Sequence, residues 1–170
     1  NLFNVNKKKI SVDYLGTNLN ENGDKTLCKD KDFILYVGSR RDYKNFANFI
    51  KAYSISKKIR KELNLILFGG EKYSKYDAEL IERYNLENKK IKFISGNNLL
   101  LQSYYMNAKL FVYPSLYEGF GLPILEAMAN SCPVCCSRTT SIPEVAGVAA
   151  EYFDPRKPEE IAKKMEKVIF

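Results

Sequence analysis

Residues 110–137 read LFVYPSLYEGFGLPILEAMANSCPVCCS. LFVYP (110–114) and PVCCS (133–137) are short apolar runs of the kind that form buried strands. Between them lie a glycine-bearing loop and a helical pattern over 123–129. Pro123 suits the first turn of a helix, where its missing N–H costs nothing. A strand, a helix and a second strand in this order predict two parallel strands joined by a helix.

The same alternation continues on both sides of this stretch. Further strand-like runs occupy 33–38, 63–69, 90–95 and 149–153, and further helical patterns occupy 45–59, 76–84, 99–107 and 158–169. We therefore predict an α/β domain with a Rossmann-like, doubly wound, mostly parallel sheet and helices on both faces. Ligands of such sheets bind beyond the carboxyl ends of the strands, where the loops gather.

The first 30 residues differ in composition from the rest. KISVDYLG (9–16) could form one short strand, while TNLNENGDKTLCKDKD (17–32) is polar and rich in turn-forming residues. We expect residues 1–30 to be an incoming segment and loop from a preceding domain, and residues 31–170 to be the Rossmann-like domain. Because the first residue is Asn1 and not Met, we expect the chain to belong to a longer protein.

Length and charge narrow the class of protein. A chain of 170 residues fits one ordinary domain. Its 27 basic and 20 acidic residues give a formal charge of +7, which favours anionic partners such as nucleotides, nucleic acid or an acidic membrane face. No apolar run approaches the roughly 20 residues of a membrane span, and no signal peptide opens the sequence. We expect a cytoplasmic location, with peripheral contact to the cytoplasmic membrane face as an option.

Residues that could hold a metal are few. The cysteines are Cys28, Cys132, Cys135 and Cys136, and the chain has no His, which also excludes a histidine general base within it. Cys132 and Cys135 have the spacing of a metal knuckle, but a closed zinc site needs about four ligands and no second pair exists. We predict no metal site, and expect the cysteines to be small apolar residues of a reduced protein.

The loop and helix after LFVYP form the strongest candidate site. Gly119 and Gly121 let the backbone approach a ligand, and the free N–H groups at the start of a helix bind phosphate or sugar oxygens. Glu118 lies at the mouth of the loop. Glu126 lies one turn into the helix, where its carboxylate can accept hydrogen bonds from the vicinal hydroxyls of a ribose. The residues alone fit a plain strand–turn–helix connection with two surface glutamates about equally well.

EGFGLPILEAM (118–128) closely resembles the Glu-(seven residues)-Glu signature of the retaining glycosyltransferases of family 4, the glycosyl transferases group 1, which have the GT-B fold. The flanking NAKLFVYPS, CPVCCS, SIPEVAG and YFDP resemble that family too. YVGSRRDYKNF (36–46) resembles the family's basic phosphate loop, and LFGGE (67–71) its next glycine turn. The resemblance covers residues 33–170.

Two departures from the family pattern stand out. The family often has a Gly two or three residues before the PV of the strand, and here Asn130 and Ser131 stand there. The family also often has an Arg directly after the glycine of the phosphate loop. Here Ser39 intervenes, which leaves Arg40 and Arg41 as rival phosphate ligands, with Arg40 favoured.

The resemblance implies a role for each matching residue. Glu126 would hold the ribose hydroxyls, and Glu118 would orient the donor sugar near its anomeric carbon. Arg40 and Lys44 would neutralise the diphosphate and stabilise it as it leaves, so that Glu118, Arg40 and Lys44 are the catalytic candidates. The expected donor-binding residues are Gly38, Arg40, Lys44, Glu118, Gly119, Phe120, Gly121, Leu122 and Glu126.

The resemblance also implies a function. GT-B enzymes have two Rossmann-like domains, and this chain resembles the C-terminal one, which holds the nucleotide sugar. The expected activity is retaining, metal-independent transfer of a hexose from a GDP- or UDP-linked donor to a saccharide or lipid-linked acceptor, in polysaccharide or glycan biosynthesis. No cofactor is expected. The missing N-terminal domain would be an obligatory partner, so this chain alone is expected to be inactive.

The alternative is a basic Rossmann-like module that binds nucleotides or nucleic acid without transferase activity. Nucleic-acid binding would need aromatic residues interleaved with a basic stripe. Tyr104, Tyr105 and Tyr113 instead lie in helix and strand patterns that indicate core positions. We therefore expect no nucleic-acid partner. The Glu-(seven residues)-Glu signature likewise argues against a GT-B epimerase or phosphorylase.

Overall fold

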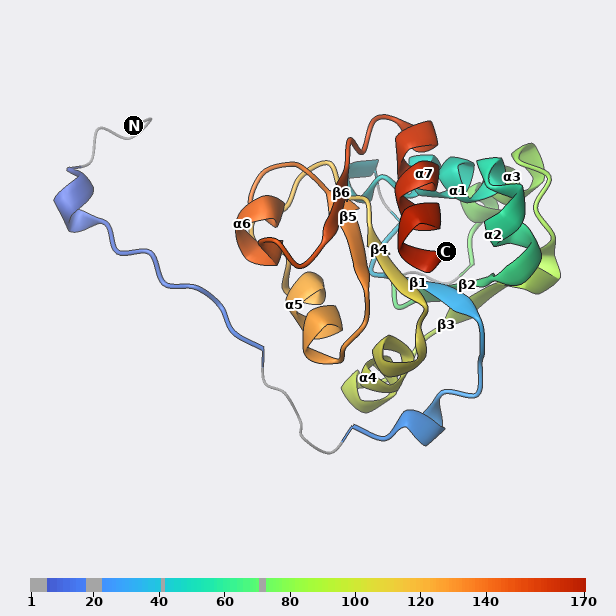
Figure 1. The fold of residues 1–170 in the computed structure, drawn as a ribbon, viewed down its shortest axis with the longest axis horizontal. Coiled ribbons are helices and arrows are strands. Elements are labelled where there is room, and N and C mark those ends of the chain that lie inside the picture. Colours follow the sequence, from blue (N-terminus) through green and yellow to red (C-terminus); the bar gives the residue numbers. More distant parts are fainter. Residues whose placement is uncertain (1–5, 18–22, 41, 71–72) are drawn as a thin grey trace.

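The computed structural model describes residues 6–17, 23–40, 42–70 and 73–170. In this part of the chain six parallel strands form one sheet in the order β3-β2-β1-β4-β5-β6 (Figure 1). The strands are β1 (Phe33–Val37), β2 (Asn64–Phe68), β3 (Ile91–Ile94), β4 (Leu110–Tyr113), β5 (Val134–Ser137) and β6 (Glu151–Phe153). All six lie within the predicted runs, and the predicted doubly wound sheet is confirmed.

Helices cover both faces of the sheet (Figure 1). One face packs against α1 (Phe46–Ile55), α2 (Lys57–Glu62), α3 (Lys75–Arg83) and α7 (Pro158–Ile169). The other face packs against α4 (Asn98–Asn107), α5 (Leu122–Ala129) and α6 (Ile142–Ala146). Short 3-10 helices span η1 (Lys7–Lys9), η2 (Lys25–Leu27), η3 (Asp42–Lys44) and η4 (Asn88–Lys90).

Strand β1 shows why these runs are apolar throughout. Successive side chains of a strand point to opposite faces, and both faces of this sheet are covered. Ile34 and Tyr36 therefore belong to the core under α1, α3 and α7, while Phe33 and Leu35 belong to the core under α4 and α5. All four are 2% exposed or less. The continuous apolar pattern is thus required by the two-sided burial.

The structure corrects the predicted helices in two places. The helix expected over 45–59 is broken at Ser56, which has an extended backbone and whose Oγ accepts the N–H of Ile59 at 3.1 Å as the N-cap of α2. Helix α6 was not predicted, because its five residues are too few to show a helical period. The suggested strand over 9–16 does not form, since residues 10–16 have no regular secondary structure.

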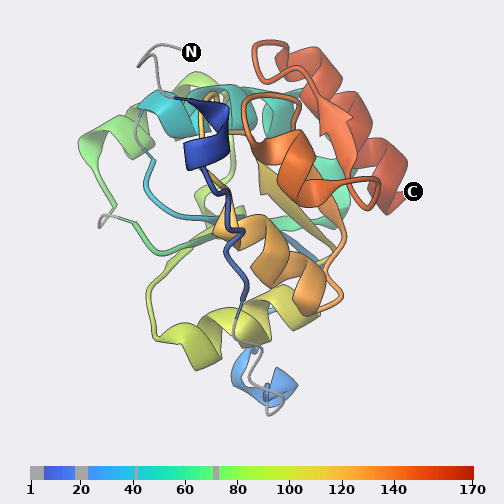
Figure 2. The same ribbon diagram turned by 90° about the vertical axis from the view of Figure 1, so that its left-hand side faces the viewer.

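The segment before the sheet contacts the domain at two separate places. The N–H of Cys28 donates to Ser103 Oγ of α4 at 2.9 Å, and Tyr104 donates from its hydroxyl to Asp30 at 2.9 Å. Further out, the Tyr14 hydroxyl reaches Glu144 of α6 at 2.5 Å. Figure 1 shows this N-terminal stretch projecting outward from the domain on the side of α5 and α6, and Figure 2 views it from that side. The predicted domain division after residue 30 stays a prediction.

The four cysteines are buried and unbridged. Cys135 and Cys136 of β5 are fully buried in the two opposite cores, as the apolar reading of this strand predicted. Burial raises the pKa of the Cys132 and Cys136 thiols to about 12, so both stay neutral and unreactive at physiological pH. None of the described helices has the length and apolarity needed to cross a bilayer.

Candidate functional site

Two loops meet where β1 and β4 end, because these strands are neighbours in the sheet. The loop after β1 leads into α1, and the loop after β4 leads into α5. Asn45 Nδ2 of the first donates to the carbonyl of Pro114 in the second at 3.0 Å, and the N–H of Leu116 donates to the carbonyl of Tyr43 at 2.8 Å. The contacts bring the two predicted motifs together at the carboxyl edge, where such sheets bind ligands.

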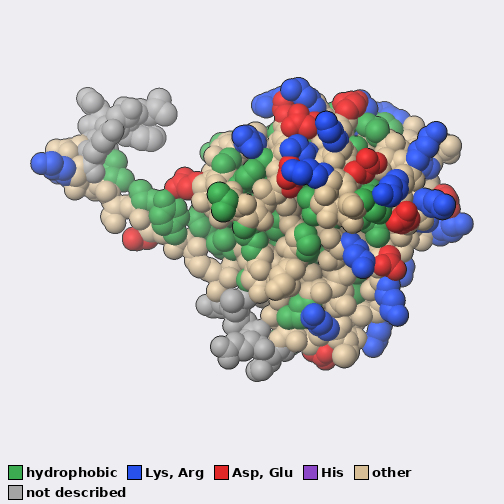
Figure 3. All heavy atoms as spheres, viewed as in Figure 1, with side chains coloured by type: hydrophobic (Ala, Val, Ile, Leu, Met, Phe, Trp, Pro, Cys, Tyr) green, Lys and Arg blue, Asp and Glu red, His purple; other side chains and the backbone are tan. Residues whose placement is uncertain are grey.

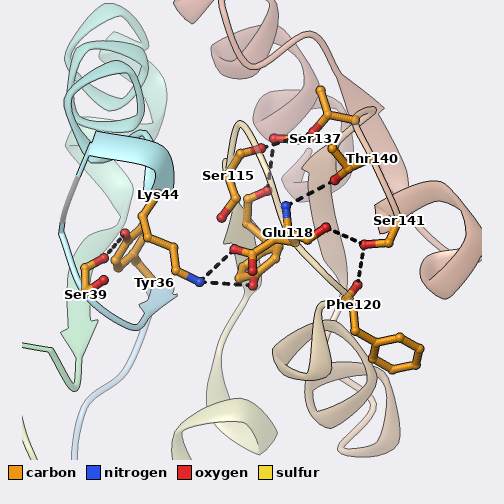
Figure 4. Close-up of polar contacts among 11 residues, drawn as sticks. Tyr36, Ser39, Lys44, Ser115, Glu118, Phe120, Ser137, Thr140 and Ser141 are labelled. Carbon is orange, nitrogen blue, oxygen red and sulfur yellow. Dashed lines mark hydrogen bonds and ion pairs between the residues drawn. The ribbon is translucent and has the colours of Figure 1, made fainter. Parts of the chain in front are cut away.

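Lys44 and Glu118 form an ion pair between these two loops. Lys44 Nζ lies 2.7 Å from Glu118 Oε1 and 3.4 Å from the hydroxyl of Tyr113 (Figure 4). Their side chains are only 15% and 13% exposed. Burial, followed by the neighbouring Glu118 carboxylate, raises the pKa of Tyr113, which therefore remains a neutral phenol. Two of the three catalytic candidates thus lie in direct contact.

The loop from Glu118 to Gly121 ends in the first turn of α5. Gly121 is the N-cap and has φ +111°, a backbone conformation that other residues rarely adopt. Pro123 occupies the first turn, as predicted. In α5 Pro123 has no N–H, and the N–H of Ile124 donates to the carbonyl of Gly121 at 3.0 Å. The N–H of Leu122 and those of the loop before it are the backbone donors that an anion could meet at this end. The space beside Gly119 is open, because a Cβ at this position would have no atom within 4 Å.

Residues from the loop after β5 hold this segment in place (Figure 4). The Ser141 hydroxyl lies 2.9 Å from the carbonyl of Glu118 and 3.0 Å from that of Phe120. Thr140 Oγ1 accepts the N–H of Glu118 at 3.1 Å. Sequence reasoning did not identify Thr140 and Ser141, although Ser141 opens SIPEVAG, one of the stretches that carry the family resemblance. That signal could have pointed to them.

Glu126 lies on the side of α5 that faces α4. The Tyr105 hydroxyl donates to Glu126 Oε2 at 3.2 Å. Burial, with the Glu126 carboxylate as the next cause, raises the pKa of Tyr105 well above its ordinary value, so Tyr105 keeps its proton as a donor. The prediction that Tyr105 and Tyr113 are core residues is confirmed, since they are 1% and 2% exposed. Their hydroxyls nonetheless reach Glu126 and Lys44.

Arg40 has different surroundings from Lys44. Its side chain is 5% exposed, and its Nε donates to the equally buried Asp77 of α3 at 2.9 Å. Its guanidinium also lies over the ring of Phe93, 5.1 Å from the centroid. Gly38 follows β1 directly and has φ +116°, as expected for the glycine of this loop. The roles of Arg40 and Gly38 in ligand binding stay predictions, and the rival Arg41 lies outside the described residues.

Arg40 and Glu118 nevertheless share one neighbour. The phenol of Tyr36 donates to the carbonyl of Ser39 at 2.6 Å. Burial is the main cause that raises the pKa of Tyr36. The charge of Arg40 lowers this pKa, and the charge of Glu118 raises it. Arg40 thus lies on the same edge as the Lys44–Glu118 pair, between the ends of β1 and β2, where its guanidinium approaches the carbonyl of Gly69 at 3.4 Å.

Comparison with known proteins assigns the family. Residues 20–169 match the model of the glycosyl transferases group 1, and the chain belongs to this family. O-antigen chain mannosyltransferase B of Escherichia coli is 37% identical over 137 residues, which cover 76% of this chain and 35% of that protein. O-antigen chain mannosyltransferase RfbU of Salmonella typhimurium is 35% identical over 159 residues, which cover 90% of this chain and 42% of that protein. The chain thus spans less than half the length of these relatives.

Solved structures agree with this assignment. The C-terminal domain of the glycosyl transferase group 1 family protein LpcC from Francisella tularensis superposes with a TM-score of 0.68 and 26% identity, over 82% of this chain and 76% of that one. Sucrose-phosphate synthase from Thermosynechococcus elongatus matches over 36% of its chain, also with a TM-score of 0.68, at 25% identity. The domain is one half of a GT-B fold.

The family decides between the two functions that the sequence left open. The chain is a glycosyltransferase domain, which favours the transferase over the nucleic-acid-binding module. The charge distribution agrees, because Lys and Arg are interspersed with Asp and Glu on the face in Figure 3 and form no continuous basic stripe there.

Proposed function

We propose that this domain binds a nucleotide diphosphate sugar at the carboxyl edge of its sheet and, with a second domain, acts as a retaining hexosyltransferase that needs no metal. The observation that carries the proposal is the Lys44–Glu118 ion pair, 2.7 Å long, beside the glycine loop and the start of α5. A cation, a carboxylate and free backbone donors in one place match the diphosphate, the sugar hydroxyls and the distal phosphate of such a donor.

The pair has a direct chemical use. A donor diphosphate carries more charge than a carboxylate and can take its place beside Lys44. Glu118 is then free to accept hydrogen bonds from the donor sugar. As the glycosidic bond breaks, negative charge grows on the leaving diphosphate, and Lys44, assisted by Arg40, stabilises it in the transition state. Two fixed cations supply the charge that a metal ion supplies in other transferases.

The nucleoside end lies further along α5. Glu126 accepts hydrogen bonds from the ribose hydroxyls, and Tyr105, by donating to its Oε2, fixes the orientation of the carboxylate. The backbone from Gly119 to Leu122 contacts the distal phosphate and the sugar. This places the donor along the carboxyl ends of β1 and β4, with its anomeric carbon near Glu118.

The relatives suggest the sugar and the acceptor. Both O-antigen enzymes are named as mannosyltransferases. We accordingly propose mannose or a similar hexose, carried by GDP or UDP, and a saccharide or lipid-linked acceptor in surface polysaccharide synthesis at the cytoplasmic membrane face. The acceptor contacts would come largely from the second domain.

Calorimetric titration of this chain with GDP and UDP tests the donor site. We expect at least one of them to bind with a one-to-one stoichiometry. Glu126→Ala should weaken that binding by about 1.5–3 kcal/mol, because it removes hydrogen bonds to a charged group. Glu79→Ala is the matched control, since Glu79 lies exposed on α3 and, among the described residues, its recorded ion pair is the exposed one with Lys75. The proposed site would be refuted if neither GDP nor UDP bound, or if Glu126→Ala and Glu79→Ala changed the nucleotide affinity equally.

A further inference from the structure

A polar cavity lies at the carboxyl ends of β5 and β6, with a volume of about 490 Å³. Its walls come from the residues that follow these strands and from the first two turns of α7. Four basic and two acidic side chains line it: Arg138, Arg156, Lys157, Lys164, Asp154 and Glu160. The lining therefore carries a net charge of +2, from four positive and two negative groups.

Most of these charged groups already have partners within the protein. Glu160 Oε1 accepts the N–H of Asp154 at 3.1 Å, and Asp154 accepts the N–H of Arg156 at 3.0 Å. This last hydrogen bond is the main cause that lowers the pKa of Asp154, so its carboxylate stays ionised. Lys157 pairs with Asp154, and Lys164 pairs with Glu151 of β6.

The guanidinium groups of Arg138 and Arg156 are different. Both residues are exposed at the cavity, and the structure records no ion pair for either of them within the described chain. The guanidinium of Arg138 lies over the ring of Tyr152, 5.2 Å from its centroid, which restricts its position without neutralising it. A guanidinium presents a planar fork of donors that matches the oxygens of a phosphate group.

The cavity borders the donor loop but shares no residue with it. Thr139, in its wall, donates from Oγ1 to the carbonyl of Ser115 at 3.2 Å. Pro155, which also lines the cavity, accepts a hydrogen bond from Asn45 Nδ2 at 2.7 Å. Asn45 also binds the carbonyl of Pro114, just before the loop that carries Glu118. A ligand in the cavity would therefore lie beside the donor site on the same edge of the sheet.

We propose that this cavity binds a phosphate group through Arg138 and Arg156, and that the phosphate belongs to the acceptor. The assignment of this phosphate to the acceptor rests on the transferase function proposed above. An acceptor anchored here by its phosphate would approach the edge where the donor sugar lies. A phosphate ester of a soluble saccharide and a phosphate of a membrane lipid present the same group, and the cavity is suited to either.

Site-resolved NMR titration of the ¹⁵N-labelled chain with methyl phosphate tests the proposal. We expect saturable shifts of the backbone amides of residues 138–139, 154 and 156–157. Arg138→Ala/Arg156→Ala should weaken this binding at least tenfold while GDP or UDP affinity stays within about twofold. Lys57→Ala/Lys163→Ala is the charge-matched control, because it also removes two exposed cations, from α2 and α7, outside the cavity.

Three results would overturn the proposal: no shifts at these amides, equal losses in both double variants, or an equal loss of nucleotide affinity, which would make the cavity part of the donor site. If neither nucleotide bound while the cavity shifts persisted, the proposed donor site would fail and phosphate binding would stand. Sedimentation with phosphatidylglycerol vesicles identifies the source. If Arg138→Ala/Arg156→Ala sediments less with the vesicles and the control variant does not, the phosphate belongs to a bilayer lipid. If sedimentation is unchanged in both variants, the phosphate belongs to a soluble acceptor.

Discussion

Lys44 and Arg40 carry the two positive charges expected to meet the donor, yet their surroundings differ. Lys44 is held by Glu118, a residue that is itself expected to contact the donor sugar. Arg40 is held by Asp77, which lies on α3 and is 1% exposed. A ligand can displace Glu118 from Lys44 with little rearrangement, because the pair spans two loops at the edge. If Arg40 moved away from Asp77, the buried Asp77 carboxylate would lose the positive charge that compensates it, which costs free energy.

Despite this difference, both cations should contribute to catalysis. In the full-length enzyme, Lys44→Ala should lower the transfer rate by roughly 10²–10³, as loss of one transition-state donor does elsewhere. Arg40→Ala should lower it by a similar factor, and Arg41→Ala should be mild. Rates with saturating donor and the donor Kd should be measured side by side, because a cation that acts on the leaving group affects the rate more than binding. If Arg41→Ala were the crippling change, the register of this loop would be off by one residue.

Arg40 should also contribute to stability. Asp77→Ala removes the carboxylate that compensates the charge of the buried Arg40 guanidinium, so we expect a loss of about 3–5 kcal/mol in the free energy of unfolding. Part of this loss belongs to the capping box that Asp77 forms with Ser74 at the start of α3. Urea denaturation of this chain measures it. Glu79→Ala on the same helix removes only an exposed pair and should change stability little; similar midpoints for both variants would contradict a structural role for the buried pair.

At the scale of elements, the donor loop is shaped by a neighbouring loop as much as by its own sequence. Gly121 permits the sharp entry into α5, but the carbonyls of Glu118 and Phe120 are held by Ser141, and the N–H of Glu118 by Thr140. These contacts turn the carbonyls toward α6. Within the described part of the chain no hydrogen bond is recorded for the N–H groups of Gly119, Phe120 and Gly121, which a ligand could therefore meet.

Ser141→Ala should therefore loosen the donor loop while keeping the fold. We expect a loss of about 0.5–1.5 kcal/mol in stability, the range for a hydrogen bond, together with a several-fold weaker affinity for the nucleotide diphosphate. Ser54→Ala is the control, since its hydroxyl also donates to a carbonyl, that of Lys51, but within α1 and away from the loop. Unchanged nucleotide affinity in Ser141→Ala would show that Ser141 does not shape the loop.

At the scale of the whole molecule, the domain presents one open edge on which the site lies. The Lys44–Glu118 pair, the donor loop, Arg40 and the β5–β6 cavity all occur at the carboxyl ends of the strands. In a two-domain GT-B enzyme a second domain closes over such an edge, excludes water and supplies acceptor contacts. The chain spans 35% and 42% of the lengths of the two O-antigen mannosyltransferases.

We expect this chain to bind the donor without transferring its sugar. It has no His to serve as a base, and nothing in the described domain closes over the site. Incubation with radiolabelled GDP-mannose or UDP-hexose and saccharide acceptors should yield no product above background, while calorimetry on the same sample shows nucleotide binding. Addition of the preceding domain should restore transfer. Robust transfer by the isolated chain would contradict the two-domain requirement.

Local signals in the sequence determined the order and type of the elements. The apolar runs and helical periods reflect burial on both faces of the sheet, which acts on each segment separately and can be recognised without the fold. For the same reason the buried cysteines of β5 and Pro123 in the first turn of α5 were predicted correctly. The glutamate signature, which lies within one loop and one helix, identified the candidate site and the family.

The tertiary structure decided which of these residues meet. Strand order brings β1 beside β4, and therefore Lys44 beside Glu118, 74 positions apart in the chain. It also directs Arg40 to Asp77 and Tyr105 to Glu126, pairs separated by 37 and 21 positions. Short-range patterns carry no information about such contacts, because they depend on which strands are neighbours and on which face each helix covers. The sequence thus named most of the charged residues of the candidate site, and only the packed sheet determined their partners.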